Sequence, residues 1–564
     1  MKILRYTLLL SLGVFLTQAC NEDEILREEP LDFLSPSNAF VEPEHVASAV
    51  FQLYNQARSY YADNTSSGNF FTHFIWGTDV AMHGRNPEVD GFGDYRIINS
   101  QSGVPQERWE KLYEMVYNAN VVINRIEEVS FNEEANKQTL LGEAYFFRAW
   151  AYRHLGHLYG GVPLVTEETL EPQRDFTRAT RQKVYEQVKA DLELARERLP
   201  EVAEVDADGR LSKAAADHVL SEILISLEDY QGAIDAASRV IDNPNFALMT
   251  ERFGSRADEP GDVYWDLFRL NNQNRSAGNT EGIWVMQVEY NTPGGYGDPN
   301  GDARFYERTL GPQYNRAQGT DGNALFLGPT TYHGGRGQGY IRPTDLYFHE
   351  VWQGEEGDIR NSNFNILRRW VVDNPESEFF GDTIDMNNPN YVDFVAGSSE
   401  RQDTLQYFYP FVLKISMINN HYDTEFQDEA TGELAGSARR TYLDWYAVRL
   451  AETYLLRAEA YLKAGDQAAA AADINAVRER ANAGAVSAGE ADIDLILDER
   501  ARELFMEEPR RVTLARLGLL YDRTQRYNPY AGATIEPHNN LWPIPFSEIE
   551  RNTLAELTQN EGYD

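Results

Sequence analysis

Residues 230–244 read Tyr-Gln-Gly-Ala-Ile-Asp-Ala-Ala-Ser-Arg-Val-Ile-Asp-Asn-Pro, directly after a helical pattern that ends near Leu227. A short turn must separate the two, and a second helix then runs towards the proline, which cannot continue it. Small residues stand at Ala233, Ala236 and Ala237, where a partner helix would touch this one. Small side chains let paired helices nest, which is typical of tetratricopeptide repeats. The segment therefore predicts a helical hairpin.

A second stretch, far along the chain, has the same organisation. Residues 447–464 show helical apolar spacing, Gly465 and Asp466 form a turn, and residues 467–481 supply a partner helix rich in small residues. Two degenerate copies are weak evidence for a repeat, because repeat arrays are recognised by several units in succession. The alternative is two unrelated helical hairpins.

Helices are also predicted elsewhere, by apolar residues three or four positions apart, in residues 43–61, 109–128, 137–159, 181–199 and 213–242, the last with the break described above. Two loop-rich regions, about 62–104 and 254–345, hold glycines among aromatic residues. In the second region only residues 282–290 have the pattern of a strand. We expect a mostly α-helical protein whose loops carry the function, since loops held by a rigid scaffold often do.

The composition is that of a folded, acidic protein. Of the 564 residues, 51 are Lys or Arg and 89 are Asp or Glu, a formal net charge of −38, with 42% hydrophobic and 12% aromatic residues. This hydrophobic content suffices for a sizeable core and argues against disorder. A surface this negative repels phosphate groups, so we expect neither nucleic-acid binding nor electrostatic attachment to anionic lipids.

The N-terminus has the pattern of an export signal. A short basic stretch precedes an apolar run that is too short to span a bilayer, and the chain's single cysteine, Cys20, follows it. This order resembles a bacterial lipoprotein signal, so residues 1–19 are expected to be a signal peptide and Cys20 to be lipidated. Residues 20–40 then form an acidic tether, which begins like the surface-export signal of Bacteroidetes lipoproteins. The alternative is an ordinary secretory signal with a chance cysteine.

Short motifs recur in a fixed order along nearly the whole mature chain. They stand at residues 31–32, 38–40, 118–120, 142–150, 159–164, 209–215, 449–452, 499–504, 510–518, 541–545 and 559–563. No single motif is diagnostic, but their order and spacing are specific. Together they resemble the SusD/RagB family, the surface glycan-binding lipoproteins of Bacteroidetes nutrient-uptake systems.

The resemblance implies both a fold and a role. The fold would be SusD-like, with four tetratricopeptide-like helical hairpins packed against an irregular, loop-rich half that carries the ligand, in a single domain, residues 41–564. The role would be to capture oligosaccharides at the outer face of the outer membrane and deliver them to a SusC-like TonB-dependent transporter, over which the protein sits as a lid. A peptide-capturing RagB-like lipoprotein is the first alternative, and a surface glycoside hydrolase is a more distant one.

Sugar binding calls for flat aromatic surfaces and for planar polar side chains that bridge neighbouring hydroxyls. The first loop region holds this mixture, and the resemblance suggests that part of the binding surface lies there, completed by aromatic residues of the second region. The candidate glycan-binding residues are Trp76, Asp79, His83, Arg85, Tyr296, Tyr314, Tyr332 and Tyr340, with Asn86, Asp90 and Tyr306 as further members. Each aromatic residue could instead pack in the core, and Asp79 could organise its loop through its own hydrogen bonds.

Catalytic and cofactor motifs are absent from the sequence. It contains no HExxH, GxSxG or GxxxxGK pattern. Residues 298–302 have calcium-like acidic spacing, but Ala303 and Thr309 stand where an EF-hand has its glycine and its glutamate. We therefore expect a protein that is not an enzyme and that needs no cofactor or metal, calcium being unsupported.

Overall fold

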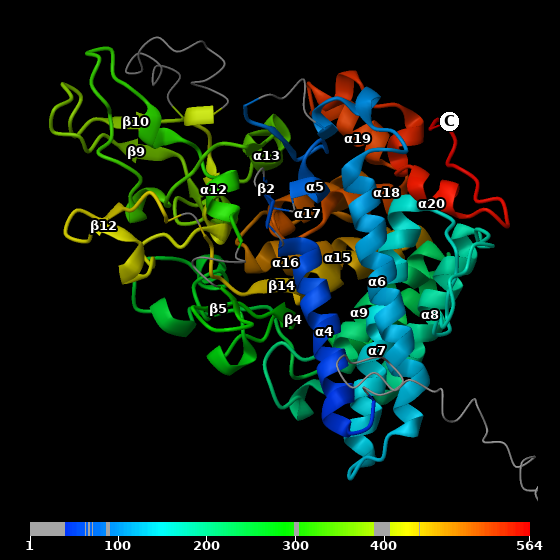
Figure 1. Cartoon of the computed structure of the whole chain (residues 1–564). Helices are drawn as coiled ribbons and strands as arrows, with labels where there is room; N and C mark the ends of the chain where they lie inside the picture. Colours follow the sequence, from blue (N-terminus) through cyan, green and yellow to red (C-terminus); the bar gives the residue numbers. More distant parts are fainter. Residues whose placement is uncertain are drawn as a thin grey trace, which may run out of the picture.

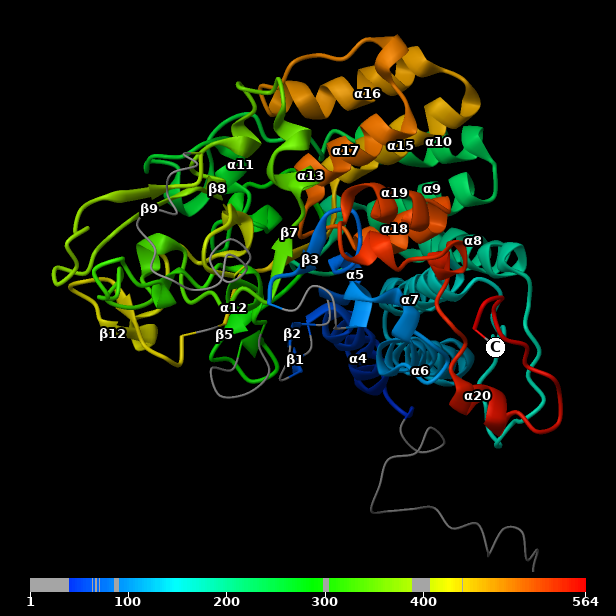
Figure 2. The same cartoon turned by 90° about the horizontal axis from the view of Figure 1, so that it is seen from above.

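A computed structural model of the protein describes residues 40–62, 64–65, 68–69, 72–85, 91–297, 304–387, 406–438 and 440–563. The expected signal peptide, the expected lipidation site Cys20 and all but the last residue of the expected tether lie outside these ranges. The molecule has a helical part and an irregular part of short strands and loops (Figure 1). Seen from above, the irregular part, in green and yellow, lies beside the helical part (Figure 2).

The helical part confirms the expected mostly α-helical fold. Every helix predicted from apolar spacing is present, and further helices follow near the C-terminus. The longer helices are α4 (Pro43–Ala62), α6 (Gly103–Arg125), α7 (Glu134–Tyr159), α8 (Arg181–Arg198), α9 (Lys213–Ser226), α10 (Tyr230–Ile241), α15 (Leu450–Ala464), α16 (Gln467–Arg480), α17 (Ile493–Leu504), α18 (Arg510–Leu517), α19 (Leu520–Tyr527) and α20 (Phe546–Arg551).

The two predicted hairpins, α9–α10 and α15–α16, are built in the same way. In each turn one residue has a positive φ, 63° at Glu228 and 88° at Gly465. An aspartate follows directly as the N-cap of the second helix, Asp229 in one hairpin and Asp466 in the other, and accepts a hydrogen bond from a backbone N–H of the first turn. Alanines of both second helices are buried. The shared turn favours a repeated unit over two unrelated hairpins.

The irregular part is an insertion between two neighbouring helices. Helix α10 packs against α15, although the chain leaves the first at Ile241 and enters the second at Leu450. The insertion is longer than the predicted loop region 254–345. Its later portion has strands of two or three residues, too short to produce an alternating hydrophobic pattern.

Within the described residues, the strands pair only in twos. The pairs are β1 (Asn64–Thr65) with β2 (Gly68–Asn69), β3 (Ala81–His83) with β7 (Ile341–Pro343), β4 (Gly282–Met286) with β14 (Trp445–Arg449), β5 (Glu289–Tyr290) with β6 (Tyr296–Gly297), β8 (Ile366–Leu367) with β11 (Phe411–Val412), β9 (Arg369–Val371) with β10 (Thr383–Asp385), and β12 (Phe426–Asp428) with β13 (Glu433–Leu434). The β4–β14 pair joins the two parts, since β14 runs directly into α15.

One hydrophobic core extends through both parts. Trp284 of β4 packs edge-on against Phe146 and Phe147 of α7, with ring centroids 5.5 and 5.9 Å apart. The C-terminal segment closes the other side, where the backbone N–H of Trp542 donates to the carbonyl of Leu158, near the end of α7. In the described ranges, no helix is both long enough and apolar enough to cross a membrane.

Candidate functional site

A strand pair brings the two predicted loop regions together. The antiparallel partner of β3, which ends at His83, is β7, which begins directly after Tyr340. Arg85 lies two residues beyond the end of β3. Trp76 forms an isolated β-bridge with Ala81, the first residue of β3. Four of the eight candidate residues therefore lie around this pair, although they come from distant parts of the chain.

Three half-buried rings form a row on this surface. The ring centroids of Trp76 and His83 are 5.4 Å apart, and those of His83 and Tyr340 are 6.4 Å apart. The turn that carries Trp76 depends on Gly77, which has a φ of +68°. A Cβ atom at this glycine would lie 2.1 Å from the carbonyl oxygen of Phe92. The position therefore requires glycine for both conformation and space.

Arg85 connects the row of rings to three glutamines. Its guanidinium lies 4.1 Å from the ring centroid of Tyr340. It donates from Nε and Nη2 to the carbonyl of Gln338, at 3.0 and 2.7 Å, and from Nη2 to the carboxamide oxygens of Gln338 and Gln313, at 3.1 and 3.4 Å. The carboxamide of Gln406 lies within hydrogen-bonding distance of Arg85 and Gln313. We call these four polar residues the arginine–glutamine cluster.

The cluster suits the recognition of hydroxyl groups. All four of its side chains are partly exposed. Each carboxamide offers both a donor and an acceptor, and the guanidinium offers several donors in one plane. Held beside aromatic rings, such groups can bind vicinal hydroxyls while a ring covers the apolar face of a sugar.

Sequence reasoning missed the three glutamines. Gln338 stands in a glycine-rich run between two candidate tyrosines, so that this position could have been found from the sequence. Gln313 and Gln406 are single polar residues in loops, without any local pattern. Their position beside Arg85 arises only from the tertiary fold.

Tyr332 makes its hydrogen bond with another residue of the insertion, Asp373. The Tyr332 side chain is 39% exposed, and its hydroxyl donates to a carboxylate oxygen of Asp373 at 2.8 Å. The other oxygen of Asp373 accepts from the backbone N–H of Leu327 at 2.9 Å. Tyr332 is thus a fixed, exposed aromatic ring outside the arginine–glutamine cluster.

Asp79 and Tyr314 lie in the interior. Asp79 is fully buried, and its carboxylate accepts from Arg510 at 2.7 Å and from Arg523 at 3.0 Å. Burial alone would raise the pKa of Asp79, but the two guanidinium groups lower it overall. Tyr314 is 1% exposed, and its hydroxyl donates to the carbonyl of Gly335 and accepts from a backbone N–H. Neither side chain faces solvent, and for Asp79 the contacts support the structural interpretation.

The remaining candidates add little to the surface. Tyr306 is buried, with an exposed fraction of 3%. The backbone of Tyr296 belongs to β6, but its side chain lies outside the described part of the structure, as do Asn86, Asp90 and the calcium-like segment 298–302. Among the residues that the structure does describe, no group of three or more His, Cys, Asp or Glu side chains could hold a metal ion.

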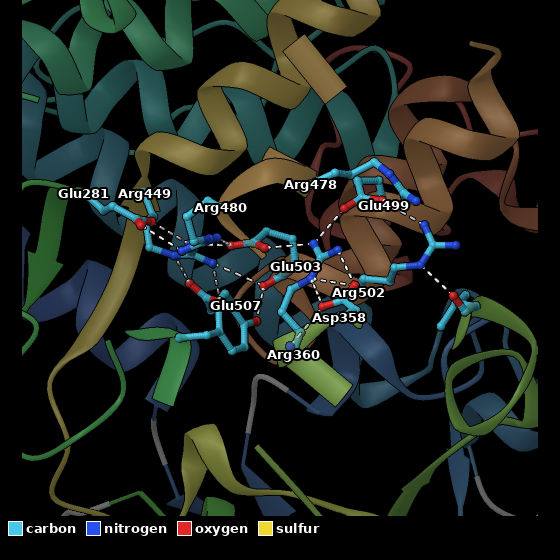
Figure 3. A network of polar contacts seen from close by, with 12 residues as sticks. Glu281, Asp358, Arg360, Arg449, Arg478, Arg480, Glu499, Arg502, Glu503 and Glu507 are labelled. Carbon is cyan, nitrogen blue, oxygen red and sulfur yellow. Dashed lines mark hydrogen bonds and ion pairs between the residues drawn. The ribbon is translucent and has the colours of Figure 1, made fainter. Parts of the chain in front are cut away.

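A buried ion network lies where the irregular part meets α16 and α17 (Figure 3). Six cationic groups and six carboxylates form it, and each side chain is at most 10% exposed: Arg360, Lys414, Arg449, Arg478, Arg480 and Arg502, with Glu281, Glu355, Asp358, Glu499, Glu503 and Glu507. The equal numbers leave the network without net charge. Its partners come from both parts of the molecule, so we interpret it as a structural joint.

The charged side chains Glu143 and Arg148 of α7 pair with other segments and not with each other. Glu143 binds Arg210 at 2.7 Å, and Arg148 binds Asp191 at 2.6 Å. Residues five positions apart on a helix point in different directions, which is why Glu143 and Arg148 do not meet. The carboxylates of both pairs are buried, and the pairs belong to the scaffold.

Comparison with known proteins gives a consistent result. A family model described as "Starch-binding associating with outer membrane" matches residues 31–225, and a model described as "SusD family" matches residues 281–563. A SusD-like protein of Formosa agariphila is 26% identical, with 98% of each chain covered. The starch-binding protein SusD of Bacteroides thetaiotaomicron is 39% identical over 119 residues, 20% of this chain and 21% of that one.

Solved structures show the same fold. A laminarin-binding SusD-like protein has a TM-score of 0.68 at 21% identity, covering 93% of this chain and all of that one. A SusD homologue from Bacteroides thetaiotaomicron has a TM-score of 0.66 at 19% identity, covering 95% of this chain and 99% of that one. With one family model that spans half of the chain and another that matches much of its N-terminal half, the protein belongs to the SusD/RagB family.

Proposed function

We propose that this protein binds oligosaccharides on the surface formed by Trp76, His83, Tyr340 and the arginine–glutamine cluster. The observation that carries the proposal is the convergence of three rings, one guanidinium and three carboxamides on one strand pair. Relatives whose names state starch or laminarin binding support a glycan as the ligand class.

The protein would be a binder without catalytic activity. Most glycoside hydrolases depend on two carboxylates that flank the scissile bond. The side chains that form the proposed surface are aromatic rings, carboxamides and a guanidinium. These groups can bind the hydroxyls of a sugar, but they include no carboxylate. Among the candidate residues that the structure describes, the one carboxylate is that of Asp79, which is buried and bound by two arginines.

We also propose that the protein acts at the outer face of the outer membrane, lipidated at Cys20, as the lid of a SusC-like TonB-dependent transporter. The lipoprotein-like N-terminus and the outer-membrane association named for the matched family model support this location. Acyl chains contribute about 0.8 kcal/mol per buried methylene, so that a diacylated cysteine needs no spanning helix.

The binding proposal is tested by calorimetry with laminarin and soluble starch. Arg85→Ala and Tyr340→Ala should each weaken binding about tenfold or more, as loss of a central contact residue does. Tyr117→Ala is the matched control, because Tyr117 is a 39% exposed tyrosine of α6 that does not belong to the proposed binding surface. Unchanged affinity in both site variants would refute the assignment of this surface as the binding site.

Further measurements separate the alternatives. Binding of peptides in place of glycans would favour the RagB-like alternative, and release of reducing ends from a polysaccharide would favour a hydrolase. If affinity purification of the tagged protein from outer membranes recovers no TonB-dependent barrel, the lid proposal fails.

A further inference from the structure

A separate groove lies where α4, the segment 202–212 and β4 meet. One cavity of about 570 Å³ is lined by Gln52, Asn55 and Trp284, among others, and a second of about 910 Å³ extends towards the starts of α4 and α7. Both cavities are lined by Phe51 and Arg210. Their volumes are those of ligand pockets, roughly 300–1,000 Å³. None of the residues of the surface proposed above lines either cavity. We call this feature the Phe51 groove; Figure 1 shows α4 running between the two parts.

Phe51 is a fixed aromatic platform at the junction of the two cavities. Its side chain is 49% exposed, and the guanidinium of Arg210 lies 5.2 Å from its ring centroid. Arg210 is held in turn by both carboxylate oxygens of the buried Glu143, at 2.7 and 2.9 Å. Tyr54 donates to the same carboxylate at 2.6 Å. One side of the ring is thus supported, and the rest of it is open to a ligand.

Trp284 supplies a buried donor without an acceptor. It is 2% exposed and lines the smaller cavity. Its indole Nε1–H finds no hydrogen-bond partner among the described residues. The indole nitrogen itself is not exposed to solvent. A buried polar group in this state costs about 1–3 kcal/mol, and a ligand acceptor that reaches it through a small side-chain movement would recover this cost. A ligand hydroxyl is such an acceptor.

The charge of the groove favours a neutral ligand. Arg210 is neutralised by Glu143, and the larger cavity is also lined by acidic residues, among them Glu44, Glu133 and Glu204. A sulfated or uronic-acid sugar would meet like charges there. The smaller cavity is lined by Arg58 and Asp208, of opposite charge, and by the carboxamides of Gln52 and Asn55, which can bind uncharged hydroxyls.

We propose that the Phe51 groove is a second carbohydrate-binding site, which holds a neutral oligosaccharide with one ring on Phe51 and one hydroxyl at the indole N–H of Trp284. Its ligand class rests on the proposed function, but its residues are independent of the first surface. Two sites on one molecule would hold a long polysaccharide by avidity, since binding at one raises the effective concentration at the other.

The test is calorimetry, which measures stoichiometry as well as affinity, with laminarihexaose and maltohexaose as ligands. The wild-type protein should bind two molecules of one of these sugars. Phe51→Ala and Trp284→Phe should each leave one molecule bound, or weaken the second event about tenfold. Trp284→Phe removes the donor and keeps an aromatic ring, smaller than the indole, against α7. The control Phe546→Ala, at a 44% exposed phenylalanine of α20, should leave two.

The double variant Arg85→Ala/Tyr340→Ala separates the two proposals. If it retains one bound sugar that Phe51→Ala then abolishes, the groove is a site in its own right. If it abolishes all binding while both groove variants bind as the wild type does, the groove proposal is overturned and the first surface stands. If the groove variants abolish all binding and the double variant changes nothing, the first surface is wrong. Binding of neither sugar by the wild-type protein would overturn both.

Discussion

Replacing Glu503 by glutamine removes one negative charge from the buried ion network. The carboxylate of Glu503 accepts hydrogen bonds from three guanidinium groups, those of Arg449 at 2.6 Å, Arg360 at 3.0 Å, and Arg480. Its Oε1 accepts from Arg449 and Arg480, and its Oε2 accepts from Arg360. Whichever oxygen the amide nitrogen replaces, at least one guanidinium then faces a donor.

The expected destabilisation is large. The Glu503 side chain is fully buried, so that water cannot replace the lost charge. The network would then hold one more cation than anions. Breaking a buried pair by removing one partner costs about 3–5 kcal/mol, because an uncompensated charge remains. We expect Glu503→Gln to lower the free energy of unfolding by this amount.

Urea unfolding followed by circular dichroism measures the effect. The matched control is Glu186→Gln, which breaks the exposed Lys183–Glu186 pair, of similar distance at 2.6 Å, and should cost less than about 1 kcal/mol. Burial alone would raise the pKa of Glu503, but the three arginines lower it well below its usual range. The stabilisation is therefore present at pH 7, and the difference between wild type and variant should shrink as the pH falls below about 4.

A double-mutant cycle tests whether the charges act as one network. Arg480→Met in the Glu503→Gln background restores the charge balance, so that its cost should be smaller than in the wild type by about 0.5–3 kcal/mol. The reasoning is refuted if Glu503→Gln costs no more than Glu186→Gln. It is also refuted if the two network substitutions are additive.

Three further outcomes are expected. Asp79→Asn should lower the free energy of unfolding by about 3–5 kcal/mol, since two buried guanidinium groups lose their carboxylate, and calorimetry should find unchanged glycan affinity in the folded protein. Gly77→Ala should cost more than about 1 kcal/mol in urea unfolding and also weaken glycan binding, because the turn that carries Trp76 must move. Burial raises the pKa of Glu425 to about 7, so the folded state retains a proton that the unfolded state has released above about pH 4.3, and stability falls as the pH rises towards 7. In the Glu425→Gln variant, the loss of unfolding free energy between pH 5 and pH 8 should be smaller than in the wild type by up to about 3 kcal/mol. An equal loss in both proteins would contradict the raised pKa.

The helices could be predicted because their signal is local. Apolar spacing located α7 and both hairpins, and the aspartates that cap α10 and α16 stand in the sequence directly beside the turns. The short strands of the insertion gave no comparable signal, since two or three residues cannot show alternation.

The site could be predicted only in part. The loop that carries Trp76, His83 and Arg85 was recognised from its mixture of aromatic and polar residues. Whether the other candidates, such as Asp79 and Tyr314, can contact a ligand depends on whether they are buried. Their burial depends on contacts with residues far along the chain, such as that of Asp79 with Arg510. Gln313 and Gln406 acquire their meaning only from the guanidinium that the fold places beside them.

The insertion between α10 and α15 has a consequence for how such chains vary. Closing a loop costs entropy that grows only with the logarithm of its length, so that lengthening an already long excursion adds little. The helices on either side, α10 and α15, contact each other directly. Loops of the insertion that belong neither to the β4–β14 pair nor to the buried ion network can therefore diverge, gain residues or lose them while the scaffold persists, and new ligand preferences can arise without a new fold.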